Sequence, residues 1–194
     1  MLPLPLESSL SVKPCYRADG VLIWVFSGID RQKPSTLQST WLRSVVMGLF
    51  PMRKAEISID GRGKPVIIVD DGVECGISLS HSHGLLALMV CDRGSAGVDI
   101  EYIKERKQRD RIARRYFGIS EKQQSVLGFY RSWTAREAFV KAVGSGIDRR
   151  FKRIALSHES HRSVIGFDAD PSHRIDFFSP APGFIGAVCQ PAAA

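Results

Sequence analysis

The segment Gly97-Val98-Asp99-Ile100-Glu101 places two carboxylates two residues apart within an apolar run. Alternate side chains of a β-strand point to the same face, so Asp99 and Glu101 would lie on one face, about 7 Å apart. Two carboxylates that project together from a buried strand repel each other unless a cation lies between them. Mg²⁺ prefers a few carboxylate oxygens together with phosphate and water, so the segment is a candidate magnesium site. The alternative is an exposed strand with ordinary ion pairs.

A second pattern places Trp133, Glu137 and Lys141 four residues apart. At helical spacing these side chains lie on one face. A Glu-Lys pair on a solvated helix contributes only about 0.2–0.5 kcal/mol, but the tryptophan predicts that this stripe is partly buried. Arg136 lies at the edge of the stripe. We therefore predict that Glu137 is a half-buried acid flanked by two cations, which is a candidate metal ligand or base.

Two further motifs, Gly63-Lys64-Pro65 and Ser80-His81-Ser82, carry little information alone. A histidine in a strand turn is more often a surface residue than a ligand. The spacing of His81 and His83 could bind zinc, but no third ligand is evident in the sequence.

Basic residues are concentrated in one part of the chain. There are 27 Lys and Arg against 20 Asp and Glu, a formal net charge of +7. Residues 104–115 alone carry seven basic and two acidic side chains. Such a run indicates a polyanionic partner, which could be a nucleic acid, a phosphate-rich cofactor or an acidic protein. The alternative is a solvated helix face.

Length and composition limit the class of protein. A chain of 194 residues corresponds to one large domain or two small lobes. With 44% hydrophobic and 24% charged residues it has globular composition, which argues against disorder. The longest apolar run, 85–91, is too short to span a membrane, and residues 1–6 lack the basic residues of a signal peptide. We therefore expect a cytoplasmic protein with reduced cysteines and no membrane association.

These residues need elements to position them, and periodicity predicts strands and helices in a definite order. Strands at 77–79 and 85–91 are expected to pair, with 81–84 as their connection. The other expected elements are strands 21–26, 57–59 and 96–102, helices 35–50, 109–117 and 131–143, a segment opened by Ser120, and strands 153–157, 163–167, 174–178 and 184–189. This order predicts two α+β lobes joined near residues 92–99.

Taken together and in this order, the motifs resemble those of the 4′-phosphopantetheinyl transferases, specifically the larger type that activates peptide and polyketide synthetases. The resemblance covers roughly residues 57–147. The matching segments are Gly63-Lys64-Pro65, Ser80-His81-Ser82, Gly97 to Glu101, Arg115-Tyr116-Phe117, Trp133 to Lys141, and Gly144-Ser145-Gly146.

The resemblance implies two similar α/β lobes packed as a pseudo-dimer, with the active site in the cleft between them. Residues 1–95 would form the lobe for the adenosine and 3′-phosphate of coenzyme A, and residues 96–194 the metal and catalytic lobe. It implies an Mg²⁺-dependent enzyme that transfers the 4′-phosphopantetheine arm of coenzyme A to a serine of an apo acyl or peptidyl carrier protein. Adenosine 3′,5′-bisphosphate would be released. We expect a monomer that binds no nucleic acid.

The same resemblance assigns roles to individual residues. The implied catalytic residues are Asp99, Glu137 and Lys141, and the implied metal ligands are Asp99, Glu101 and Glu137. The implied coenzyme A contacts are Lys64, Pro65, Ser80, His81, Asp99 and Lys141. Two departures from the family pattern stand out. Arg136 replaces the usual lysine, and the upstream arginine motif fails at residues 33–36, where Arg31, Lys33 or Arg43 could substitute; of these, Arg43 is the predicted contact.

The basic run acquires an interpretation from this resemblance, because carrier proteins are acidic. Residues 104–115 would steer the carrier, and Phe117 with the apolar edge of 120–129 would complete the docking surface. Two other functions stay open at this point: a basic nucleic-acid-binding module, and a carrier-protein binder that has lost catalysis. The absence of any nucleic-acid-binding motif disfavours the first, and the intact acidic residues disfavour the second.

Overall fold

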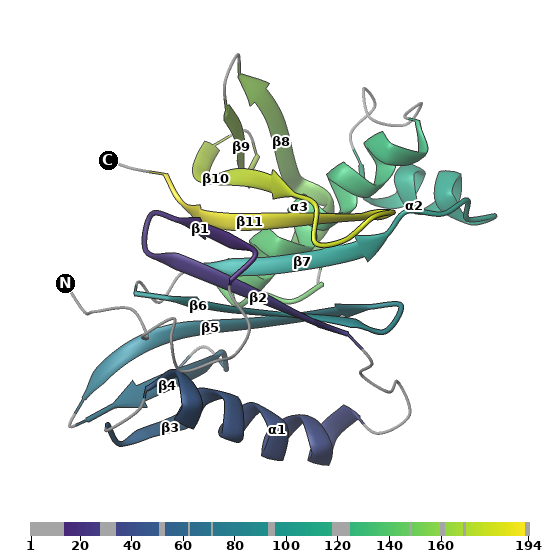
Figure 1. Cartoon of the computed structure of the whole chain (residues 1–194). Helices are drawn as coiled ribbons and strands as arrows, with labels where there is room; N and C mark the ends of the chain where they lie inside the picture. The colour runs from purple at the N-terminus through teal and green to yellow at the C-terminus, as the bar shows by residue number, and fades with distance from the viewer. Residues whose placement is uncertain are drawn as a thin grey trace.

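Two antiparallel sheets follow one another along the chain and, with three α-helices in the described residues, give a mixed α+β fold (Figure 1). The computed structural model describes residues 14–27, 34–50, 53–61, 63–70, 72–92, 96–117, 125–147, 149–159, 162–168 and 170–192. In this part of the chain no helix is both long and apolar enough to cross a membrane.

The first sheet is built from the N-terminal half of the chain. Its elements are β1 (Tyr16–Ala18), β2 (Val21–Ser27), β3 (Ala55–Ile59), β4 (Pro65–Val69), β5 (Val73–Ser82) and β6 (Leu85–Cys91), with helix α1 (Pro34–Leu49) between β2 and β3.

The second sheet is built from the C-terminal half. Its strands are β7 (Gly97–Tyr102), β8 (Ile154–Glu159), β9 (Arg162–Phe167), β10 (Asp170–Phe178) and β11 (Phe184–Pro191). Helices α2 (Arg109–Tyr116) and α3 (Val126–Val143) and the short 3₁₀ helix η3 (Arg149–Arg153) lie between β7 and β8 in the chain.

The two sheets share one strand order. The first runs β2-β6-β5-β4-β3 with β1 added at its edge, and the second runs β7-β11-β10-β9-β8. In both, the first strand is followed by helix, and it pairs with the last strand of the unit. The predicted mixed α+β class is therefore confirmed, and it takes the form of two sheets with one topology.

The first sheet is covered on both faces, which explains its apolar strands. Strand β2 alternates so that Leu22 and Trp24 join the core beneath α1. Its other side chains, Val21 and Ile23, pack against Val98 of β7 in a separate core between the sheets. Strand β7 and helix α1 consequently lie on opposite faces of this sheet (Figure 1).

Helix α3 packs directly on the second sheet, and Gly97 makes that approach possible. A Cβ atom at Gly97 would lie 2.2 Å from the carbonyl oxygen of Ala138 and 2.6 Å from the amide nitrogen of Ala142. Both are backbone atoms of α3, so any larger residue would force the strand and the helix apart. The glycine therefore sets how closely the acidic strand β7 lies to the helix that carries Glu137.

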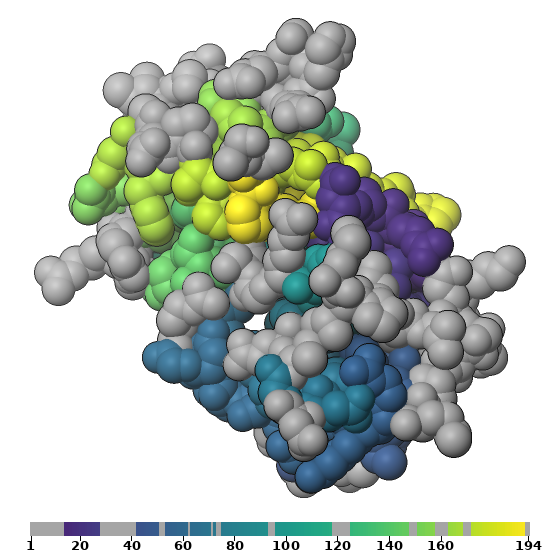
Figure 2. Space-filling view, turned by 90° about the vertical axis from the view of Figure 1, so that its left-hand side faces the viewer, coloured from purple at the N-terminus to yellow at the C-terminus, as the bar shows by residue number. Residues whose placement is uncertain are grey.

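The N-terminal hairpin also contacts the second sheet. In the view of Figure 2, the purple β1–β2 segment lies against the yellow end of the chain. Arg174 of β10 pairs with Asp19 in the turn between β1 and β2, and Tyr16 donates to Asp176 at 3.2 Å. These polar contacts hold the two sheets together at a second place, away from β7.

Several expected elements differ in their bounds. The expected connection over 81–84 is wrong, because β5 continues through Ser82 and only His83 and Gly84 form the turn, both with positive φ (45° and 80°). Helix α3 begins at Val126 rather than 131, because Ser125 caps it by accepting from Gly128 N at 3.1 Å. The expected segment at Ser120 lies outside the described residues. The four cysteines are free, as expected.

Candidate active site

Asp99 is held at the junction of the two sheets. It is only 6% exposed, and its Oδ1 accepts from Lys141 Nζ and from Ser80 Oγ, both at 2.8 Å. The Lys141 ammonium also donates to the carbonyl oxygen of Val98 at 3.1 Å. The other carboxylate oxygen, Oδ2, is buried and has no hydrogen-bond partner among the described residues. A buried carboxylate oxygen without a donor is costly unless a cation contacts it.

Two further acids lie close enough to perturb each other. Burial raises the pKa of Glu101, and the charge of Asp99 raises it further. Burial also raises the pKa of Glu137 to about 7; Asp99 and Glu101 add to this shift, and Lys141 opposes it. Three carboxylates thus share one region with Lys141, and Arg106 also acts on Glu101, which leaves more negative than positive charge in the cluster. The excess of negative charge favours an additional cation.

The chemistry of these groups fits a hard divalent cation. The candidate metal ligands are all carboxylate oxygens. Mg²⁺ prefers such oxygen ligands, whereas zinc is usually bound by nitrogen and sulfur. Within the described ranges, no three His, Cys, Asp or Glu side chains are already gathered at metal-binding separations. Instead, Lys141 Nζ occupies one oxygen of Asp99, while Oδ2 stays available. The available oxygen and the raised carboxylate pKa values are the observations that fit a metal.

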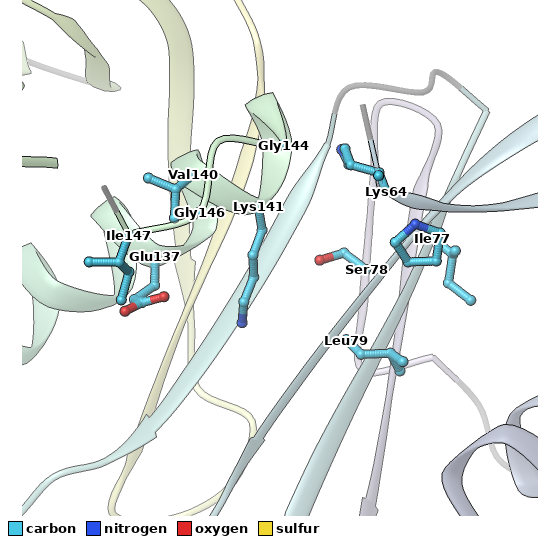
Figure 3. Close-up of a pocket in the computed structure, with 12 residues that line it drawn as sticks. Lys64, Ile77, Ser78, Leu79, Glu137, Val140, Lys141, Gly144, Gly146 and Ile147 are labelled. Atoms are coloured by element: carbon cyan, nitrogen blue, oxygen red, sulfur yellow. The ribbon is translucent and has the colours of Figure 1, made fainter. Parts of the chain in front are cut away.

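A pocket of about 410 Å³ adjoins this cluster. Figure 3 shows Lys64 and Ser78 on one side and Glu137 and Lys141 on the other. The first side belongs to the first sheet, and the second belongs to the C-terminal part of α3. The lining residues are Gly63, Lys64, Pro65, Ile77, Ser78, Leu79, Glu137, Val140, Lys141, Gly144, Gly146 and Ile147. The charged groups therefore stand at the wall of a pocket that both halves of the chain line.

Lys64 connects three segments that are distant in the sequence. Its side chain is buried, and Nζ donates to the carbonyl oxygens of Ala142 at 2.8 Å and Ala96 at 3.3 Å. Ala142 lies in the last turn of α3, where carbonyl groups lack helical partners and a positive charge is favourable. Gly144 ends this helix in the left-handed conformation, with φ 73°. Lys64 thereby fixes the end of α3 that carries Lys141.

Three serines alternate along β5 and bind the edge of β7. The hydroxyl oxygens of Ser78, Ser80 and Ser82 accept from the backbone N–H groups of Val98 at 3.2 Å, Ile100 at 3.1 Å and Tyr102 at 3.2 Å. Strand β7 is the edge strand of the second sheet, so these N–H groups would otherwise lack strand partners. We call Ser78, Ser80 and Ser82 the serine ladder. Its alternation, Ser-Leu-Ser-His-Ser, was the signal available in the sequence.

Other predicted contacts are not brought to the cluster. His81 is exposed, and the alternation of β5 directs it to the face opposite Ser80. Arg43 is exposed on α1, and α1 covers the face of the first sheet that β7 does not touch. The structure therefore gathers Lys64, Pro65, Ser80, Asp99, Glu101, Glu137 and Lys141 around the pocket and the cluster, and it leaves His81 and Arg43 apart.

The expectation that Arg136 flanks Glu137 is wrong. Arg136 is fully buried, and its guanidinium donates to the carbonyl oxygens of Ser132 at 3.1 Å and Ile154 at 3.2 Å. It also lies 4.6 Å from the centroid of the Phe117 ring. Consecutive helical residues are rotated by about 100°, which turns Arg136 away from the stripe of Glu137. Phe117 is itself buried, so it cannot form part of an exposed docking surface as expected.

The fold and the site together define an α+β protein with an acidic, lysine-containing cluster beside a pocket between two sheets. Comparison with known proteins identifies a family with these features. Residues 95–189 match the family model described as the 4′-phosphopantetheinyl transferase superfamily. The chain belongs to this superfamily, as its motifs predict.

Individual relatives support the same assignment. The chain is 29% identical over 180 residues to 4′-phosphopantetheinyl transferase psf-1 of Bacillus pumilus, covering 86% of this chain and 75% of psf-1. It is 28% identical over 160 residues to Sfp of Bacillus subtilis, covering 76% and 69%. It is 32% identical over 119 residues to HetI of Nostoc sp., covering 55% and 49%. The chain thus spans about half the length of HetI, and 59% of AcpT of Salmonella typhimurium.

Proposed function

We propose that this protein transfers the 4′-phosphopantetheine arm of coenzyme A to a serine of an apo acyl or peptidyl carrier protein, with Mg²⁺ required and adenosine 3′,5′-bisphosphate released. The observation that carries the proposal is the cluster of Asp99, Glu101, Glu137 and Lys141 beside a pocket lined by both sheets, in a member of this superfamily.

The proposed organisation is a pseudo-dimer of two similar lobes, residues 1–95 and 96–194, with the active site between them. Two observations support it. The lobes share one strand order, and the pocket is lined by residues 63–79 from one lobe and 137–147 from the other. In this arrangement neither lobe alone has a complete site.

The reaction is a phosphoryl transfer. The carrier serine oxygen forms a bond to the phosphorus that bears the pantetheine arm, and the bond from that phosphorus to the bridging oxygen of the pyrophosphate breaks. The leaving adenosine 3′,5′-bisphosphate keeps the electron pair of the broken bond. Such transfers depend mainly on positioning and on stabilising charge. Lys141, at the pocket wall, would supply one positive charge to the pyrophosphate.

The residues that would hold Mg²⁺ are Asp99, Glu101 and Glu137. When bound, the metal supplies charge neutralisation at the pyrophosphate. Asp99 has a buried oxygen with no donor among the described residues, which leaves it available as a ligand. Glu137 is the proposed base for the serine proton. It lines the pocket, where it would face the incoming serine as a general base.

The contacts to coenzyme A receive unequal support. Lys64, Pro65 and Lys141 line the pocket, and Ser80 touches Asp99 directly. His81 and Arg43 lie elsewhere, so their assignment rests on the resemblance alone for His81 and on charge alone for Arg43. We retain Lys64, Pro65 and Lys141 as the proposed contacts of the pocket.

The carrier protein is proposed to dock on the basic face of α2. Arg111, Arg114 and Arg115 are exposed on this helix, as are Lys104 and Lys107 before it. Leu127 at the start of α3 is 48% exposed and would supply an apolar contact in place of Phe117.

Mass spectrometry tests the proposed function directly. An apo carrier protein incubated with this protein, coenzyme A and Mg²⁺ should gain about 340 Da, the mass of the arm. The gain should disappear with EDTA and return with added Mg²⁺. A carrier whose modified serine is replaced by alanine is the matched control and should gain nothing. Unchanged masses across fatty-acid, polyketide and peptide synthetase carriers would contradict the proposal.

A further inference from the structure

The serine ladder does more than join the two sheets. A serine hydroxyl has one proton to donate and two lone pairs that accept. In each ladder serine one lone pair is used by a backbone N–H of β7, so the proton remains for another acceptor. Ser80 gives its proton to Asp99 Oδ1 at 2.8 Å, and Ser82 Oγ lies 3.0 Å from Glu101 Oε2. Ser78 contacts no carboxylate within the described part of the chain.

The direction of the Ser82 hydrogen bond follows from its neighbours. Lys104 Nζ lies 2.9 Å from His83 Nε2, and an ammonium group can only donate. A His83 ring that accepts from Lys104 at Nε2 carries its proton on Nδ1, which lies 3.2 Å from Ser82 Oγ. Ser82 accepts from this N–H and from Tyr102 N, so its own proton must go to Glu101. The chain of donors runs from Lys104 through His83 and Ser82 to Glu101.

At Asp99 the donors are distributed unequally over the two oxygens. Ser80 and Lys141 both donate to Oδ1, whereas Oδ2 receives no donor from the described residues. Two donors on one oxygen fix the rotation of the carboxylate, and the other oxygen stays available. Ser80 is itself fixed, because it accepts from the backbone N–H of Ile100, the residue that follows Asp99 on β7.

We propose that Ser80 and Ser82 are positioning residues for the metal site, orienting Asp99 and Glu101 through hydrogen bonds whose direction the backbone of β7 and His83 determine. The proposal rests on the proposed function, because it takes these two acids as Mg²⁺ ligands. It gives Ser80 a role toward a carboxylate rather than toward a phosphate of coenzyme A. It also explains why two serines of the ladder, and not the third, lie opposite acids.

Metal binding measured without turnover tests this proposal. Mn²⁺ can be titrated into the full-length protein with coenzyme A present and carrier absent, and the free ion followed by its paramagnetic resonance signal. Removing a group that orients a metal ligand typically weakens metal binding 10- to 100-fold. We expect Ser80→Ala and Ser82→Ala each to weaken Mn²⁺ binding about 10-fold or more.

Ser78→Ala is the matched control, because it removes the same kind of bond to β7 without touching an acid. It should lower the melting temperature about as much as the other two variants. Because Ser78 lines the proposed coenzyme A pocket, its Mn²⁺ binding is compared in a parallel titration without coenzyme A, where it should stay at the wild-type value. A second variant, Ser80→Thr, keeps the hydroxyl and should retain most of the Mn²⁺ affinity. If Ser80→Ala does not fold, Ser82→Ala compared with Ser78→Ala still tests the inference.

The outcomes separate the inference from the function on which it rests. One outcome would overturn the inference alone. In it the wild type transfers the arm and binds Mn²⁺, and Ser80→Ala and Ser82→Ala bind Mn²⁺ as tightly as the wild type. Equal weakening in all three alanine variants would also overturn it, because it would reduce the ladder to a structural contact. A wild-type protein that neither binds Mn²⁺ nor modifies a carrier would overturn the proposed function, and the inference with it.

Discussion

Lys141 Nζ lies 2.8 Å from Asp99 Oδ1 and joins the last turns of α3 to strand β7. The same helix end is held from the first sheet by Lys64, whose ammonium donates to Ala142, the next residue after Lys141. Two lysines thus hold the end of the helix, Lys141 through a carboxylate and Lys64 through a carbonyl group. Glu137 faces the pocket from the same helix. It lies one turn before Lys141 on the same helix face, so the contacts that hold Lys141 also hold Glu137 in place.

Asp99→Asn should abolish transfer and the response to the metal. The amide keeps the shape of the side chain, but it removes the charge that a divalent cation needs. We expect transfer to fall by about 100-fold or more. Mg²⁺ with coenzyme A should raise the melting temperature of the wild type and leave that of Asp99→Asn unchanged. Near wild-type transfer by this variant at low Mg²⁺ would show that Asp99 is not a ligand.

Glu137→Gln should change how stability depends on pH. The folded-state pKa of Glu137 is about 7, against an ordinary value of 4.5. Between these values the folded protein keeps a proton that the unfolded chain has released, so the free energy of unfolding falls as pH rises through this window. Without Mg²⁺, the free energy of unfolding of Glu137→Gln should therefore decrease less than that of the wild type as pH rises through this window. Above pH 7 it should be more stable than the wild type by on the order of 2–3 kcal/mol.

Denaturant unfolding at several pH values between 4.5 and 8 measures this difference, with Mg²⁺ absent and then present. Added Mg²⁺ should reduce this difference in stability. The metal binds and stabilises the wild type more than the variant, because only the wild type keeps all three carboxylate ligands. The same variant should lose about 100-fold or more in kcat, since it removes the proposed base. An effect confined to the KM for coenzyme A would instead assign Glu137 a role in binding.

Gly97→Ala should separate β7 from α3. Its Cβ would lie 2.2 Å from a backbone oxygen of α3, so the strand or the helix must shift. Overpacking of this kind typically costs about 1–3 kcal/mol, and we expect the upper end because both obstructing groups are backbone. Gly61→Ala is the control, since nothing lies within 4 Å of a Cβ there. Chemical denaturation of both variants measures the cost, and equal stabilities would contradict the close approach.

Arg136→Ala should act on stability rather than on catalysis. The fully buried guanidinium donates to two backbone carbonyls and lies over the Phe117 ring, and the alanine leaves a cavity and an unpaired Ile154 carbonyl oxygen. We expect a loss of about 3 kcal/mol or more. Arg131→Ala, on the same helix but over the Phe177 ring, is the comparison. Coenzyme A binding by the folded fraction should stay unchanged for Arg136→Ala, and a selective loss of it would return Arg136 to the site.

The acids of the site could be predicted because their pattern is local. The alternation of Asp99 and Glu101 on a strand and the four-residue spacing of Glu137 and Lys141 on a helix each lie within one element. Short connections likewise predict the pairing of β5 with β6, whereas the pairings of β2 with β6 and of β7 with β11 join strands that are distant in the sequence. Periodicity determines which side chains share one face of a strand or helix, and this is all that the prediction of these acids requires.

The partners across elements could not be predicted in the same way. The carbonyls that Lys64 binds lie 32 and 78 residues away in the sequence, so no local pattern contains them. Arg136 was misplaced because its neighbour Glu137 carried the signal, whereas a rotation of about 100° separates the two. His81 lies in a recognised motif, but strand alternation turns it from Ser80 to the opposite face. The contacts of Lys64 therefore depend on the packing of one element on another, whereas the faces of Arg136 and His81 follow from the periodicity of their own elements.

The exposed arginines of α2 give the last prediction, which concerns the carrier protein. Arg111 and Arg114 are exposed and make no ion pair with an acid among the described residues. If they steer an acidic carrier, reversing both to glutamate should lower kcat/KM for the carrier, by about 10-fold or more at low salt. The KM for coenzyme A should hardly change, because its proposed pocket is lined by other residues. Reversal of Arg17 and Lys54, exposed on the first sheet, changes the net charge equally and is the control.

Salt dependence distinguishes steering from direct contact. Exposed charges are screened over about 8 Å at physiological ionic strength, so wild-type kcat/KM for the carrier should fall as salt is added. The reversed variant should be slow at low salt, and its kcat/KM should not fall as salt is added, because salt then screens the repulsion between the new glutamates and the carrier. Equal losses in the Arg17 and Lys54 control would attribute the effect to net charge alone. Loss of coenzyme A affinity would place α2 in the cofactor site, and no loss at all would leave its arginines as a solvated face.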